Sequence, residues 1–121
     1  MKPLCELISA EILPAARAFI AKRLVETHGF SQQQTAEAMG LTQPAVSQYK
    51  RNLRGYRIEI FSANPRIQEM FESLTKRIAQ GLPKDEQTKE FYAICKEMAV
   101  DGTIVKLFGA EWAGTCEICM K

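Results

Sequence analysis

Polar side chains able to read DNA bases are grouped at Gln43, Ser47 and Gln48. A glutamine amide can form two hydrogen bonds with N6 and N7 of adenine in the major groove, and a serine hydroxyl can bond several bases. All three side chains face outward if they lie on one short helix whose inward residue is Val46. These residue types at this spacing therefore predict direct readout of base edges in duplex DNA.

Basic residues follow this polar group directly, at Lys50, Arg51, Arg54 and Arg57, with no acidic residue among them. A helix docked in the major groove passes the phosphate backbone at this point, so we expect Lys50, Arg51 and Arg54 to bind phosphates. Gln32, at the start of the preceding helix, is predicted to add a phosphate contact. The alternative is an ordinary pair of helices with a solvated, charged outer face.

Two helices and a sharp turn must position these side chains, and residues 31–51 have the spacing of a helix-turn-helix. Two short helices that cross closely need a small residue at their contact, which Ala36 supplies. The turn needs a residue that tolerates positive φ, which Gly40 supplies, and Val46 is the apolar anchor of the second helix. We expect this second helix, the recognition helix, to lie with its N-terminal end in the major groove.

Capping residues set the expected limits of both helices. Ser31 and Gln34 have the S-x-x-Q spacing of a capping box and predict a helix that continues to about Met39. Thr42 is a suitable N-cap for the recognition helix, which is expected to span about Gln43–Leu53.

Apolar residues at helical spacing predict a long helical segment before this unit, over residues 4–28. Pro14 is unfavourable in a helix interior, so it is expected either to begin the main helix or to kink a longer one. Gly29 is the expected residue at the C-terminal end of that helix.

Two more helices are predicted after the helix-turn-helix. Asn64-Pro65 reads as an N-cap followed by an N1 proline, and apolar residues recur at helical spacing from there to position 80. A second stripe spans 85–100, and both stripes must be buried either on the first domain or on a second subunit. The segment 56–61 is either a short strand or an extended connector, and the tail after Gly102 has too weak a pattern to assign.

The segment from Ser31 to Arg51 resembles the helix-turn-helix of phage λ-repressor-like (XRE-type) regulators, in which one glutamine opens the second helix and another opens the recognition helix. Gln32 and Gln43 match these two positions. Most of the chain is also similar to a group of archaeal predicted transcriptional regulators with the same domain. The segments that carry this wider similarity are Cys5-Glu6-Leu7-Ile8, Ile12-Leu13-Pro14-Ala15, Ala45-Val46-Ser47-Gln48-Tyr49, Asn64-Pro65-Arg66-Ile67 and Cys116-Glu117-Ile118-Cys119.

The resemblance implies an all-α fold, in which a λ-repressor-like helix-turn-helix domain (residues 1–62) is followed by additional C-terminal helices (residues 63–121). It also implies a regulator of transcription that binds specific sequences of double-stranded DNA. A helix-turn-helix alone buries a modest area, so we expect a homodimer on a pseudo-palindromic site. The C-terminal helices are the expected dimerisation region.

The cysteines allow three interpretations. They lie at Cys5, Cys95, Cys116 and Cys119. The pair Cys116-x-x-Cys119 supplies half of a four-ligand zinc site, to which Cys95 would add a third ligand; the alternatives are a disulfide or redox dithiol, and inert thiols. We expect no bound metal or cofactor, and we interpret His28 as a helix-end residue that is favourable there when charged.

Composition gives only weak guidance about partners. The chain has 121 residues, 46% of them hydrophobic and 25% charged, which is typical of one soluble domain or a small domain with a dimerisation extension. Its net charge of +2 supports nucleic-acid binding only weakly. No apolar run approaches the ~20 residues of a membrane span, and Glu6 and Glu11 interrupt the first apolar stretch. We therefore expect a cytoplasmic protein with no signal peptide and no membrane contact.

No enzyme activity is expected, because the sequence has no phosphate-binding loop, no metalloprotease motif and no nucleophile paired with a base. Two other classes of function remain alternatives. One is a thiol- or metal-sensing regulator that acts through Cys116 and Cys119. The other is an antitoxin-like interaction protein that binds DNA only as a side activity.

Overall fold

The computed structural model describes residues 4–51, 61–62 and 64–109. In these residues it contains helices and no strand, which confirms the all-α prediction. The helices are α1 (Leu4–Leu7), a π-helix (Ile8–Ile12), α2 (Leu13–Glu26), α3 (Gln32–Met39), α4 (Gln43–Arg51), α5 (Pro65–Ala79), α6 (Lys84–Val100) and α7 (Thr103–Phe108). None of these described helices is both long and apolar enough to cross a bilayer. Positions 56–60, for which the sequence left strand or connector open, lie outside the described residues.

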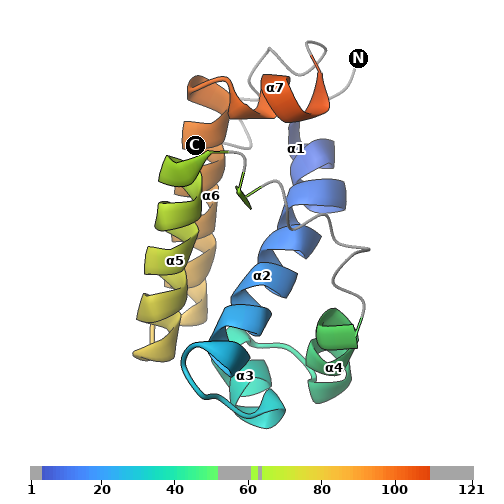
Figure 1. Ribbon diagram of the computed structural model, residues 1–121, viewed down its shortest axis with the longest axis vertical. Helices are drawn as coiled ribbons and strands as arrows, with labels where there is room; N and C mark the ends of the chain where they lie inside the picture. The colour runs from blue at the N-terminus through green and yellow to red at the C-terminus, as the bar shows by residue number, and fades with distance from the viewer. Residues whose placement is uncertain (1–3, 52–60, 63, 110–121) are drawn as a thin grey trace.

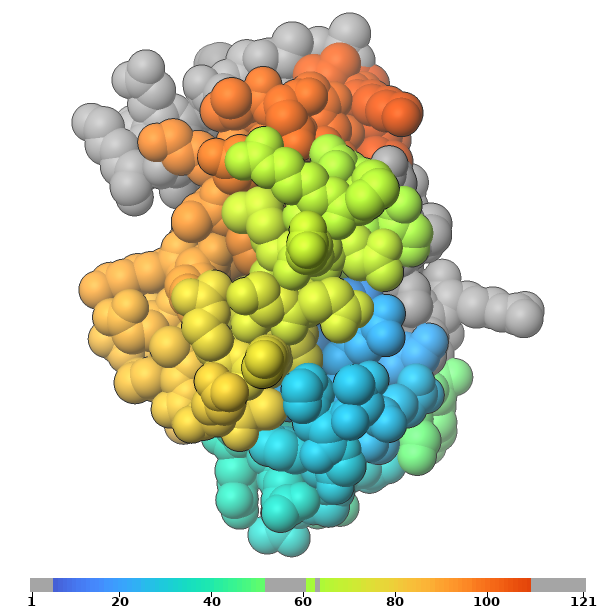
Figure 2. All heavy atoms as spheres, turned by 60° about the vertical axis from the view of Figure 1, so that its left-hand side comes forward, coloured from blue at the N-terminus to red at the C-terminus, as the bar shows by residue number. Residues whose placement is uncertain are grey.

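One long helical rod organises the molecule. It consists of α1, the π-helix and α2, and α5 and α6 run alongside it as an antiparallel pair (Figure 1). Helix α7 lies across one end of the molecule, whereas α3 and α4 lie at the opposite end against α2. Figure 2 shows α5 and α6 side by side along the length of the molecule. In this view too, α3 lies at the end of the molecule away from α7. The predicted recognition helix, α4, is therefore held at the end remote from α7.

Pro14 lies in the first turn of α2 without ending the helical rod. Just before it, at the junction of the π-helix and α2, the Leu13 N–H donates to the Ile8 carbonyl oxygen, five residues back. Proline has no N–H and its ring crowds the preceding turn, so a regular α-helix passes through it only with distortion. The wider π-helical turn accommodates that distortion. The structure thus combines the two expected possibilities, because α2 begins beside Pro14 and yet continues a longer rod.

Phenylalanine rings form the centre of the core. The Phe71 ring of α5 lies 4.3 Å from that of Phe61, 6.2 Å from Phe19 of α2 and 6.4 Å from Phe91 of α6, measured between centroids. Phe61 and Phe71 are completely buried. Since the four rings come from α2, α5, α6 and the segment before α5, these elements share one core.

The apolar stripes of α5 and α6 are buried inside the chain. Ile67 and Ile78 of α5 and Ile94 of α6 belong to the same cluster of buried residues as Leu24 of α2. Of the two possibilities that the sequence left open, these faces therefore pack on the N-terminal helices. The boundary between residues 62 and 63 and the dimerisation role of the C-terminal region stay predictions.

The start of α5 is tied to the start of α7. As predicted, Asn64 is the N-cap of α5, and its Oδ1 accepts a hydrogen bond from the Arg66 N–H (3.0 Å). The Asn64 Nδ2 also donates to Asp101 Oδ2 and to Thr103 Oγ1, both at 3.0 Å. Asp101 Oδ1 in turn accepts from the Thr103 N–H at 2.9 Å. Helix α7 was not predicted because it is only six residues long and these contacts with the distant Asn64 help to hold it.

The position of Phe71 at the centre of the ring cluster generates a test of the shared core. Phe71→Ala should lower the free energy of unfolding in urea by about 3–5 kcal/mol, because it removes a fully buried ring that contacts three elements. The control is Lys76→Ala on the exposed side of α5, which should change it by less than about 0.5 kcal/mol. A loss below about 1 kcal/mol for Phe71→Ala would contradict a single core.

Candidate nucleic-acid interface

The predicted capping box starts α3. The Ser31 hydroxyl accepts a hydrogen bond from the Gln34 N–H (3.0 Å), and Gln34 Oε1 accepts one from the Ser31 N–H (2.8 Å). The helix ends at Met39, as expected. The cap fixes Gln32 as the first residue of α3, where it is half-buried.

Gly40 makes the turn between α3 and α4, with a φ of 69° in the left-handed region that favours glycine. The Leu41 N–H donates to the Ala36 carbonyl oxygen (2.8 Å). The Gly40 N–H donates to that of Glu37 (3.4 Å), and together the two bonds form a Schellman motif. A Cβ atom on Gly40 would lie 2.7 Å from Cε of Lys84 in α6. The backbone therefore favours glycine at this position, whereas the end of the flexible Lys84 side chain could shift to admit a Cβ atom.

Helix α4 is fixed to the rest of the molecule by its inward side. Thr42 Oγ1 accepts a hydrogen bond from the Ala45 N–H (3.3 Å), as expected of an N-cap. Val46 is 1% exposed and Ala36 is 5% exposed, and α4 packs against both α2 and α3. The predicted anchor and the predicted small contact residue are thus both buried. The predicted end of α4 at Leu53 lies outside the described residues.

Of the predicted base-reading residues, Gln48 lies on the side of α4 away from Val46, whereas Gln43 and Ser47 lie towards its flank. Each residue of an α-helix is rotated by about 100° from the one before, so Gln43, Ser47 and Gln48 lie about 60°, 100° and 160° from Val46 and cover an arc from the flank to the outward side. Gln43 and Gln48 are exposed, and Ser47 is half-buried. Arg51 is exposed in the same arc, at the C-terminal end of α4. This face can donate and accept hydrogen bonds along its length and carries a positive charge at one end.

Lys50 has a different environment from Arg51. It is exposed, but it lines a hollow between α4 and α2 together with Lys22 and Glu26. Lys50 is therefore on the flank of α4 beside α2, where it can reach a phosphate only at the edge of the outward face. Arg54, the other predicted phosphate ligand, lies outside the described residues.

A contact between α6 and the turn after α3 has no counterpart in the sequence-based prediction. Gln87 Nε2 of α6 donates to the carbonyl oxygens of Ala38 (2.8 Å) and Leu82 (2.9 Å). The aliphatic part of the Lys84 side chain lies against Gly40. Gln87 and Ala38 are 49 positions apart, so no local pattern could have indicated that α6 touches this turn.

Of the three cysteines in the zinc interpretation, only Cys95 lies in the described residues. The described residues contain no group of three His, Cys, Asp or Glu residues that could hold a metal ion. Cys95 is completely buried in α6, and desolvation by burial raises its pKa from 9.0 to about 12. A protonated, buried thiol is a poor metal ligand and a poor nucleophile. Cys116 and Cys119, the other two proposed ligands, lie outside the described residues.

No protein-family model matches this chain, and neither a curated protein nor a solved structure does. The resemblance to λ-repressor-like regulators therefore depends on the motif between Ser31 and Arg51 and on the segments that accompany it.

The raised pKa of Cys95 generates a test that uses the variant in which Cys5, Cys116 and Cys119 are replaced by serine. At pH 7, an aromatic disulfide reagent should label the folded variant at least ~100-fold more slowly than the same variant in urea, because burial lowers both the thiolate fraction and access to the sulfur. Labelling at similar rates in both states would contradict the buried position of Cys95.

The raised pKa of Cys95 also predicts how the free energy of unfolding changes with pH. The folded state holds the Cys95 proton more tightly than the unfolded state, so the associated stabilisation is complete below pH 9.0 and is lost as the pH rises towards about 12. In the variant without the other three cysteines, Cys95→Ala should abolish this loss of unfolding free energy above pH 9.0.

Proposed function

We propose that α2, α3 and α4 form a λ-repressor-like helix-turn-helix and that the protein is a sequence-specific, double-stranded-DNA-binding regulator of transcription in the cytoplasm. One observation carries the proposal. The α3–α4 pair combines a glycine turn at positive φ with two buried contact residues, Ala36 and Val46, and α4 carries polar residues that are exposed or half-buried on its outer side. A pair of packed helices with an exposed polar outer face is what groove binding requires.

In the proposed complex, the N-terminal half of α4 enters the major groove. Gln43 and Gln48 offer amides that can pair with adenine, and Ser47 offers a hydroxyl between them. Arg51 follows at the end of the outward face and binds the phosphate backbone. Gln32, at the N-terminus of α3, adds a phosphate contact from the neighbouring helix.

The proposal includes a homodimer on a pseudo-palindromic site, because one helix-turn-helix contacts a single half-site. The buried stripes of α5 and α6 are occupied within the chain, so the dimer must use another surface of the molecule. Sedimentation of the full chain with a selected duplex would give the stoichiometry directly.

The general test is selection of bound sequences from a random duplex library, using the purified full chain. Recovery of one enriched motif supports sequence-specific binding. Recovery of unenriched sequences, with tight binding only at low salt, would instead support non-specific attraction to phosphates.

Replacement of Gln43 should affect sequence preference. Gln43→Ala is expected to cost about 1–3 kcal/mol on the best duplex and to flatten the preference at one base pair, because the amide that pairs with a base edge is lost. Gln68→Ala, on α5, is the matched control and should leave both the affinity and the motif unchanged. An unchanged motif for Gln43→Ala would refute its assignment as a base-reading residue.

Replacement of Arg51 should affect affinity without changing the preference. Arg51→Gln is expected to weaken binding to all duplexes alike and to lower the slope of log K against log salt by about one. The matched control is Lys106→Gln on α7, at the far end of the molecule, which should leave the slope as it is. A changed motif with an unchanged slope would show that Arg51 contacts bases instead of phosphates.

A further inference from the structure

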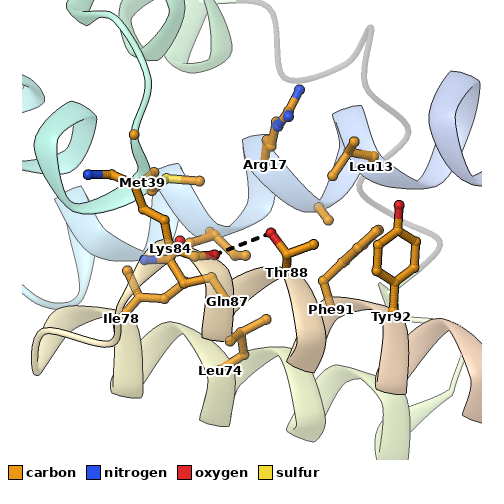
Figure 3. Close-up of a pocket in the computed structure, with 13 residues that line it drawn as sticks. Leu13, Arg17, Met39, Leu74, Ile78, Lys84, Gln87, Thr88, Phe91 and Tyr92 are labelled. Carbon is orange, nitrogen blue, oxygen red and sulfur yellow. Dashed lines mark hydrogen bonds between the residues drawn. The ribbon is translucent and has the colours of Figure 1, made fainter. Parts of the chain in front are cut away.

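A cavity of about 430 Å³ lies between α2 and α6, beside the end of α3 (Figure 3). Its apolar lining includes Leu13 and Ile20 from α2, Leu74 and Ile78 from α5, and Phe91 from α6. This volume is within the range of pockets that bind small organic molecules, and a mostly apolar lining with a few polar groups is typical of them.

The polar groups around this cavity are predominantly cationic or neutral. Arg17 of α2 and Lys84 of α6 line it, whereas none of the described lining residues is acidic. Within residues 4–51, 61–62 and 64–109, neither Arg17 nor Lys84 forms an ion pair. Thr88 and Tyr92 add hydroxyl groups from α6; the Thr88 hydroxyl donates to the Lys84 carbonyl oxygen at 3.2 Å. Two cations that have no ion-pair partner among the described residues, at the edge of an apolar cavity, are complementary to an anion with an apolar body.

We propose that this cavity binds a small amphipathic carboxylate. The hydrocarbon part occupies the apolar interior between α2 and α6, and the carboxylate lies at the edge of the cavity. The charged ends of Arg17 and Lys84 point away from each other in Figure 3, so these two exposed side chains turn towards the carboxylate when it binds. Arginine can bind a carboxylate through two parallel hydrogen bonds, and lysine contributes a mobile point charge. Burial of the hydrocarbon provides most of the affinity, and the two cations select the acid over its neutral analogue.

The site is connected to the proposed recognition helix, and this part of the inference depends on the proposed function. Met39 and Gly40, at the end of α3 and in the turn before α4, also line the cavity. The Lys84 side chain that would bind the carboxylate lies against Gly40, and Gln87 in the next turn of α6 holds the Ala38 carbonyl oxygen. A ligand that moves Lys84 therefore alters the packing at the turn that positions α4. By linkage, such a ligand changes the affinity for DNA.

The binding test uses octanoate and octanol with the full chain in the absence of DNA, measured by calorimetry. Octanoate should bind at least about fivefold more tightly than octanol, because only the acid can pair with the two cations. Arg17→Gln combined with Lys84→Gln should remove this preference and leave octanol binding as it was. Thr88→Phe, which places a ring into the cavity from an exposed position on α6, should weaken both probes strongly.

Lys96→Gln, which removes an exposed lysine of α6 that does not line the cavity, is the matched charge control. Equal affinity for octanoate and octanol in the unmodified protein would overturn the proposal. So would an effect of Lys96→Gln as large as that of the double substitution, because general charge attraction would then explain the preference. Thermal unfolding of each variant identifies any substitution that fails to fold, and the comparison of octanoate with octanol in the unmodified protein is independent of the variants.

The coupling test measures the affinity for a selected duplex with and without saturating octanoate. A change of at least about threefold is expected in the unmodified protein, and none in the double variant of Arg17 and Lys84. If octanoate binds but the DNA affinity does not change, the proposed coupling is wrong, whereas the proposal of a carboxylate site still holds. Failure to bind any duplex would refute the proposed function, whereas the calorimetry would still decide the carboxylate site.

Discussion

The burial of α2 around most of its circumference is the constraint on which the rest of the structure depends. Ala15, Ala16, Ala18 and Ala21 are all at most 2% exposed, although alanine offers little apolar surface of its own. Small side chains allow neighbouring helices to approach closely, so several helices can cover α2 at once. Helices α3 and α4 cover one end of α2, and α5 covers another side. The proposed DNA-binding pair and the C-terminal helices are therefore parts of one packed unit that shares a central helix.

Elements governed by local backbone chemistry could be predicted from the sequence. Ser31, Gly40 and Asn64 each act on the backbone within a few residues, and the predicted starts of α3 and α5 are confirmed. Features that depend on distant contacts could not be predicted, as α7 and the phenylalanine cluster show. The burial of the alanines in α2 was also hard to predict. Alanine occurs at exposed and buried helix positions alike, so the sequence indicated only part of the buried surface of α2.

The same distinction holds for the candidate site. The inward position of Val46 could be predicted from spacing, and it determines which residues of α4 face outward. Lys50 and Arg51 are adjacent in the sequence, yet one is beside α2 and the other on the outward face. Charge patterning does not distinguish them, because the difference comes from the direction in which α4 packs. The contact of α6 with the α3–α4 turn also arises from tertiary packing, and it makes this turn a meeting point of both halves of the chain.

The π-helix sets the rotational register of the first turn of the rod. A hydrogen bond that spans five residues accommodates one residue more than the α-helical bond that spans four, so the segment 8–12 is equivalent to an α-helix with a single inserted residue. Leu7 and Ile8 before the insertion and Ile12 at its end are all buried. If the same residues formed a regular α-helix, the N-terminal residues would be turned by about 100° about the rod axis and their side chains would leave the core. The wider turn thus keeps the residues on both sides of it in the same core.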